Sequence, residues 1–125
     1  MKNIKSIAGV ALLAMMATTS HAAKSVTVGE LQGFTGPLES MIGAMSGGAN
    51  LAVTEANASG KFLQGTINVV QGDSVCIDPA VAIAQAEKMV NEDNVMAIMG
   101  PNCSGNTIAV IEGVIVPNGI VSISP

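Results

Sequence analysis

The chain has 125 residues, of which 49% are hydrophobic and 11% charged, and its formal net charge is −4 at pH 7. An acidic chain of this kind is not expected to bind nucleic acid or an anionic membrane surface. His21 is its single histidine, so the chain beyond it lacks the commonest general base and metal ligand. We therefore expect a protein that is not an enzyme and needs no metal or other cofactor.

The first 22 residues have the pattern of a secretory signal peptide. Lys2 and Lys5 precede an apolar run over residues 7–17, and small residues follow up to Ala22. This pattern predicts cleavage after Ala22, and the run is shorter than the roughly 20 residues that span a bilayer. We expect an exported mature chain that does not insert into the membrane. It would hold three lysines and nine acidic residues, a net charge of −6.

The residues after the leader alternate between β-branched runs and segments with helical periodicity. The predicted strands and helices follow one another as strand 25–31, helix 40–57, strand 66–70, helix 79–91, strand 95–99, helix 106–115 and strand 120–124. Strands separated by helices of this length indicate an α/β fold, with a parallel sheet, right-handed crossovers and helices on both faces. About 100 residues are enough for one small domain.

Two capping signals support the second and third predicted helices, whereas glycines weaken the first predicted helix. Asp78 and Pro79 are a typical N-cap and first-turn pair, and Asn106 or Thr107 can cap the third helix. The first helix contains three glycines, each of which lowers its stability by roughly 1 kcal/mol. We expect these glycines to pack closely against the sheet; they are Gly43, Gly47 and Gly48.

The segment after the third predicted strand is the strongest candidate for a binding site. Gly100 and Pro101 break the apolar run, and Cys103, Ser104 and Gly105 lead into a helix. Backbone N–H groups at a helix start, together with the Ser104 hydroxyl, suit a carboxylate or phosphate. Ligands of parallel sheets bind at the carboxyl ends of the strands, where the loop after the first strand also lies. That loop adds three further candidate residues, namely Gln32, Thr35 and Ser40.

Two other kinds of site are not expected. The glycines at 29, 33 and 36 do not have the dinucleotide-binding spacing, and no acidic residue closes the second strand where that motif needs one. Gly33 would instead allow the backbone to approach a ligand or a neighbouring loop. Asp73 and Asp78, without histidine or further oxygen ligands, would make a poor metal site.

The two cysteines beyond the leader, Cys76 and Cys103, both follow predicted strands. In an exported protein, such a pair is most simply a structural disulfide between two loops at one edge of the sheet. The alternative is a redox-active pair, although thiol catalysts usually place Cys-x-x-Cys at a helix start. Both interpretations are kept, with the disulfide preferred.

Several motifs in order resemble the leucine/isoleucine/valine-binding protein family, the type I periplasmic binding proteins of ABC importers. They are Gly-Phe-Thr-Gly-Pro at 33–37, Asn-Ala-Ser-Gly at 57–60, Cys-Ile-Asp-Pro at 76–79, Gly-Pro-Asn-Cys-Ser-Gly at 100–105 and Ile-Ser-Pro at 123–125. The resemblance implies a two-lobed protein that closes on its ligand. Residues 23–125 would be a partial N-terminal lobe, about the first third of a full member.

The resemblance also implies a function and roles for particular residues. The chain would be a substrate-binding component in the periplasm, would bind an amino acid or a related small carboxylate solute, and would serve the membrane permease subunits of an ABC importer. Ser104 matches the family's carboxylate-binding serine, and Cys76 and Cys103 match its disulfide. Two alternatives remain: a truncated fragment without appreciable ligand binding, and a thiol-disulfide protein.

Overall fold

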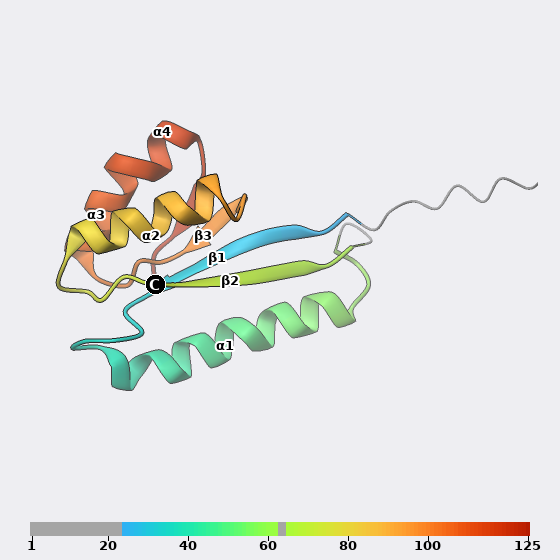
Figure 1. Ribbon diagram of the computed structural model, residues 1–125. Helices are drawn as coiled ribbons and strands as arrows, with labels where there is room; N and C mark the ends of the chain where they lie inside the picture. Colours follow the sequence, from blue (N-terminus) through green and yellow to red (C-terminus); the bar gives the residue numbers. More distant parts are fainter. Residues whose placement is uncertain (1–23, 63–64) are drawn as a thin grey trace, which may run out of the picture.

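The computed structural model describes residues 24–62 and 65–125 (Figure 1). The predicted signal peptide, residues 1–22, lies outside the described residues. The described elements, in chain order, are β1 (Val26–Gln32), α1 (Glu39–Ala58), β2 (Ile67–Asp73), α2 (Pro79–Asn91), β3 (Ala97–Met99), α3 (Ser104–Val110), the π-helical turn η1 (Ile111–Ile115), α4 (Val116–Asn118) and β4 (Val121–Ile123). Among them, no helix is long and apolar enough to cross a membrane.

The four described strands form one parallel sheet in the order β2-β1-β3-β4. The strand that comes first in the chain therefore lies inside the sheet. It pairs with β2 along its whole length, from Val26 opposite Ile67 to Gln32 opposite Asp73. On its other side Glu30 lies opposite Met99 of β3. The predicted α/β fold with a parallel sheet is confirmed.

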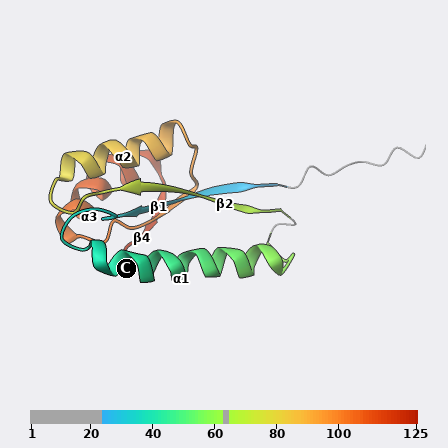
Figure 2. The ribbon, with the colours of Figure 1, turned by 60° about the horizontal axis from the view of Figure 1, so that its bottom comes forward.

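Helices lie on both sides of this sheet, as Figures 1 and 2 show: α1 on one side, and α2, α3 and α4 on the other. The hydrophobic core fills the second side. There α2 contributes Ala82, Ala86 and Met89, which pack with Leu31 of β1 and Ile98 of β3. The remaining buried residues of this core are Val95 before β3, Val110 of α3, and Val114 and Ile115 of the π-helical turn.

The predicted side-chain cap is present at the start of α2 but absent at the start of α3. The Asp78 carboxylate accepts a hydrogen bond from the Ala80 N–H at 2.9 Å, so it caps α2 as predicted. The third helix begins at Ser104, two residues before the predicted start, and Cys103 at its N-cap makes no side-chain capping bond. Asn106 does not cap it, because its side chain is buried and donates to the Ser74 carbonyl. Gly119, with φ of +64°, ends the helical stretch.

The expectation for the three glycines of α1 is wrong. A Cβ added at Gly43, Gly47 or Gly48 would have no heavy atom within 4 Å, so these residues do not approach the sheet. Close backbone approach occurs instead at Gly100, where φ is +108° and a Cβ would collide with the Leu31 carbonyl oxygen. Gly100 lies in the loop after β3, at the edge where binding was predicted.

Candidate functional site

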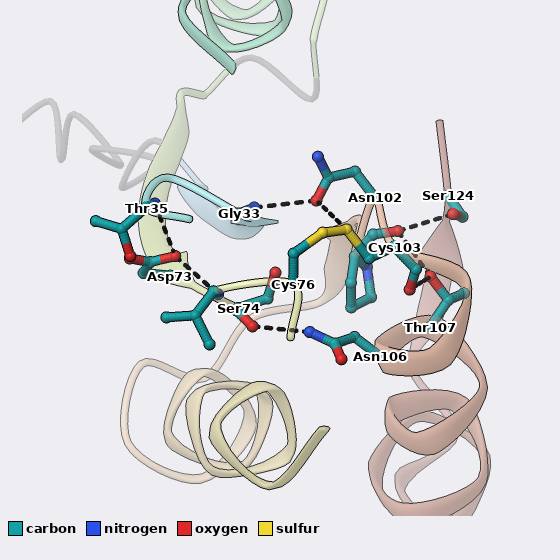
Figure 3. Close-up of a disulfide and its surroundings, with 12 residues drawn as sticks. Gly33, Thr35, Asp73, Ser74, Cys76, Asn102, Cys103, Asn106, Thr107 and Ser124 are labelled. Carbon is teal, nitrogen blue, oxygen red and sulfur yellow. Dashed lines mark hydrogen bonds between the residues drawn. A yellow bond between two sulfur atoms is a disulfide. The ribbon is translucent and has the colours of Figure 1, made fainter. Parts of the chain in front are cut away.

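The carboxyl ends of β1, β2 and β3 meet at one edge of the sheet, where their loops are joined by hydrogen bonds (Figure 3). The Gly33 N–H donates to Asn102 Oδ1 at 3.0 Å, which links the loop after β1 to the loop after β3. A Cβ at Gly33 would lie 3.4 Å from Cys76 Cβ. As expected, Gly33 lets the backbone pass close to a neighbouring loop.

A disulfide joins Cys76, in the loop after β2, to Cys103 at the start of α3. Their Cα atoms are 5.5 Å apart, within the usual range for a disulfide. The predicted pairing of the two cysteines is therefore confirmed, and it ties α3 to the β2 loop (Figure 3). The same loop is held by Asn106, which donates to the Ser74 carbonyl at 2.7 Å.

Thr35, one of the predicted ligand-binding residues, is part of a hydrogen-bonded loop cluster around Asp73. Its hydroxyl donates to Asp73 Oδ2 at 2.6 Å, and Asp73 Oδ1 accepts the N–H groups of Thr35 and Val75. Burial alone would raise the pKa of Asp73. The hydrogen bonds from Thr35, Val75 and Phe34 outweigh it and hold that pKa below its ordinary value. Asp73 thus carries a negative charge beside Thr35.

The other predicted site residues differ in their accessibility. Ser104 and Gly105 are exposed at the first turn of α3, and Ser40 is exposed in the first turn of α1. Gln32 is fully buried at the end of β1, and neither of its amide atoms has a hydrogen-bond partner. The structure thus leaves Ser104, Gly105, Thr35 and Ser40 accessible, whereas Gln32 would have to become exposed before it could touch a solute.

The start of α3 has features that suit an anion. The first N–H groups of any helix have no partner within the helix, and the macrodipole favours negative charge there. In α3 the N-cap residue is Cys103, and its side chain accepts no hydrogen bond from these N–H groups. Thr107 Oγ1 shares its hydrogen bond between the carbonyls of Pro101 and Cys103, and this contact fixes the loop after β3 against the first turn of α3. The exposed residues Ser104 and Gly105 therefore lie in a helix turn whose preceding loop is fixed by hydrogen bonds.

Residues 25–125 match the sequence model of a family described as periplasmic binding protein. The chain belongs to the periplasmic binding protein family. The match extends from the residue before β1 through β4 to the end of the sequence, and it therefore includes every described helix and strand.

Individual periplasmic binding proteins show the same relationship. An "amino acid binding protein" of Pseudomonas aeruginosa is 32% identical over 121 residues, which are 97% of this chain and 32% of that protein. A Leu/Ile/Val-binding protein homolog of Brucella suis is 31% identical over 105 residues, 84% of this chain and 26% of that protein. The chain thus spans about a third or less of the length of these relatives.

Solved structures agree with the sequence comparison. The branched-chain amino acid transporter substrate binding protein LivJ of Streptococcus pneumoniae, in complex with isoleucine, is 32% identical and superimposes with a TM-score of 0.74, covering 82% of this chain and 29% of that one. A solute binding protein of an R. palustris ABC transporter, in complex with benzoate, is 24% identical with a TM-score of 0.71, over 82% and 27%. The second likeness shows the shared fold only.

The sequence placed residues 100–105 and 122–125 at this edge of the sheet but indicated no role for three residues that build it. Asn102 connects two loops, and Ser122 and Ser124 donate to the carbonyls of Gly100 and Pro101 at 2.8 Å. Their sequence positions were the only available indication, since Asn102 and Ser124 follow β3 and β4, and Ser122 lies within β4. Asp73 and Asp78 belong to no group of three or more potential metal ligands among the described residues.

Proposed function

We propose that this periplasmic binding protein chain contributes to solute capture for an ABC importer, and that it binds the carboxylate of an amino acid or related small solute. The observation that carries the proposal is the exposed start of α3, where Ser104 and Gly105 present a hydroxyl and backbone N–H groups on a disulfide-bonded loop. A carboxylate there would receive charge-assisted hydrogen bonds and the favourable end of the helix dipole.

The relatives support the class of solute. One is described as an amino acid binding protein, and the LivJ structure contains isoleucine. The R. palustris protein of the same fold contains benzoate, which shares only the carboxylate with isoleucine. A site for a carboxylate is therefore the simplest requirement that these two solutes share, and the remainder of each solute would be selected by other residues.

Ser40 and Thr35 would contact the solute from the loop after β1. The Thr35 hydroxyl already donates to Asp73, so Thr35 would offer a solute only its remaining acceptor capacity. That capacity, beside an ionised Asp73, suits the ammonium group of an amino acid. Gln32 would contribute only after a rearrangement that uncovers it. Export through the segment 1–22 and delivery to permease subunits complete the proposal.

NMR titration of the full chain with isoleucine and benzoate, beside their neutral amides, tests the proposal. We expect the carboxylates to shift the Ser104 and Gly105 amide signals in a saturable way, and the neutral amides to leave them unchanged. Because the chain spans about a third of its relatives, its affinity should be weak, since a small ligand is normally buried on most of its surface. Ser104→Ala should weaken carboxylate binding by about 2 kcal/mol.

Ser59→Ala is the matched control, because Ser59 is exposed at the far end of α1. It should leave the titration unchanged. If millimolar carboxylates shift neither Ser104 nor Gly105, the proposal fails and the alternative of a fragment without appreciable binding is supported.

A further inference from the structure

The turn between α4 and β4 contains Asn118, the only asparagine of the sequence that is followed by a glycine. In an Asn-Gly pair the next backbone nitrogen can reach the side-chain amide carbon easily, because glycine has no Cβ to shield that nitrogen. Asparagine belongs to the thermolabile residues for the same chemical reason. Asn118 therefore has a reactivity that neither solute binding nor the hydrophobic core uses.

Both residues of this pair are exposed, and α4 lies at the outer end of the helical layer (Figure 1). The helix has only three residues, Val116–Asn118, and none of them is buried. A Cβ added at Gly119 would have no heavy atom within 4 Å, so the space around this glycine is open. Segments with so few buried contacts open locally at a low free-energy cost. We therefore expect the end of α4 to fray while the sheet stays folded.

In the closed turn both reacting groups are held by hydrogen bonds. Asn118 Nδ2 donates to the Val114 carbonyl at 2.8 Å, and the Gly119 N–H donates to the Val116 carbonyl at 3.2 Å. The attacking nitrogen and the amide that it must reach are thus both bound to carbonyls of the preceding turn. The reaction needs a conformation in which these two bonds are broken, so its rate should follow the population of the frayed state.

We propose that Asn118 is a site of spontaneous deamidation, which proceeds when the end of α4 opens. The Gly119 nitrogen attacks Asn118 Cγ, and the new C–N bond closes a succinimide ring. The Cγ–Nδ2 bond breaks, and the amide nitrogen leaves as ammonia with the proton of the Gly119 N–H. Water then adds to either carbonyl of the ring and opens it, which gives aspartate or isoaspartate. The reaction consumes one water, releases one ammonia and needs no other reactant.

Either product changes the entry to β4. The bond to the Val114 carbonyl is lost with its donor, and the helix macrodipole and unpaired carbonyls oppose a negative charge at a helix C-terminus. β4 is short and pairs with β3 through Val121–Ile123. The Gly100 N–H donates to the Ile123 carbonyl at 2.8 Å, so the loop after β3 depends on this strand. Deamidation at Asn118 should therefore loosen that loop, whether or not the chain binds a solute.

Peptide mapping by mass spectrometry of the full chain, stored in warm and mildly alkaline buffer, tests the site. We expect the mass gain of deamidation at Asn118 before any other asparagine, and labelling of the same peptide by an isoaspartyl methyltransferase. Urea at a concentration that leaves the sheet folded should accelerate the gain. Asn118→Gln should abolish it, because the longer side chain must close a larger ring. Asn91→Gln is the matched control, since Asn91 is exposed at the end of α2, and it should leave the gain unchanged.

Hydrogen exchange of the Gly100 amide measures the consequence. In the deamidated chain, separated by ion exchange, this amide should exchange about tenfold faster, as expected when a locally opening segment loses one hydrogen bond. Asn118→Asp has the charge without the altered main chain, so its increase should be smaller than that of the isoaspartate form. No mass gain at Asn118, an equal gain at other asparagines, a rate that urea leaves unchanged, or unchanged Gly100 exchange would overturn the proposal.

Discussion

Asn102 accepts a hydrogen bond from the Gly33 N–H across 69 residues of sequence, so one side chain holds the loop after β1 against the loop after β3. The disulfide crosses the same region, because Cys103 follows Asn102 directly and Cys76 Sγ would lie 3.6 Å from a Cβ at Gly33. The candidate site therefore sits on three loops that are connected covalently and by hydrogen bonds.

Replacing Asn102 should loosen this edge. Asn102→Ala removes the acceptor and leaves the Gly33 N–H without its partner, a change that costs about 1–3 kcal/mol when the donor stays buried. Urea unfolding followed by circular dichroism measures the loss. Asn102→Asp keeps an acceptor and should retain more of the stability. Asn68→Ala, at an exposed position of β2, should have little effect, and an equal loss in that control would contradict the role assigned to Asn102.

The stability of the chain should decrease at acidic pH because of Asp73. Its pKa in the folded state lies below its ordinary value of 3.8, so the ionised carboxylate stabilises the fold at higher pH. That contribution is lost as the pH falls through the lowered pKa. Thr35→Val removes the side-chain donor and should raise the pKa of Asp73 toward 3.8. An NMR titration of Asp73 from pH 6 to about 2 measures the shift, and an unchanged pKa in Thr35→Val would contradict this explanation.

The disulfide should act as a structural link. Cys76 and Cys103 are 27 residues apart, and closing a loop of this length stabilises a protein by about 3 kcal/mol in the chain-entropy model. Cys103→Ser should therefore lower the melting temperature, and a reducing agent should lower that of the unaltered chain to a similar extent. An insulin reduction assay examines the redox alternative. Efficient catalysis that Cys103→Ser abolishes would favour a thiol-disulfide protein instead.

Alanine at two different glycines should have opposite effects. Gly47→Ala adds a methyl group to an open position of α1 and should stabilise the helix by about 1 kcal/mol. In Gly29→Ala the added Cβ would lie 2.8 Å from Met89 Sδ and 3.2 Å from Ile98 Cγ1, so we expect a lower melting temperature. The melting temperatures of the two variants measure these effects. A higher melting temperature for Gly29→Ala would contradict the tight packing described around Gly29.

The strand and helix order was predictable because each element has its own local signal. β-branched runs mark β1 and β2, and Asp78 with Pro79 marks the start of α2. The start of α3 could not be predicted in this way, because an asparagine such as Asn106 can either cap a helix or donate a hydrogen bond to a distant carbonyl. The fold selects the second by placing Ser74 beside it.

The site was predictable in part. Ser104 could be placed in the loop region after β3 by its sequence position, and the structure shows it exposed there, while its contact with a ligand stays a prediction. The burial of Gln32 could not be anticipated, since its sequence position is equally compatible with an exposed loop. The part played by Asn102 depends on a residue 69 positions away, and no local pattern reports such a pairing. The packing of the α1 glycines was misjudged for the same reason, because it depends on which tertiary elements come near.

The central place of β1 has a consequence for how the chain reaches its folded state. Among the described strands β1 is synthesised first, and it pairs with β2 on one side and with β3 on the other. Val28 therefore cannot pair with Ala97 until the chain has been made as far as β3. Pairings so distant in sequence slow folding, because the intervening chain must be ordered first. During synthesis, one side of β1 can pair with β2 once residues 67–73 have been made, whereas its other side stays unpaired until residues 97–99 follow.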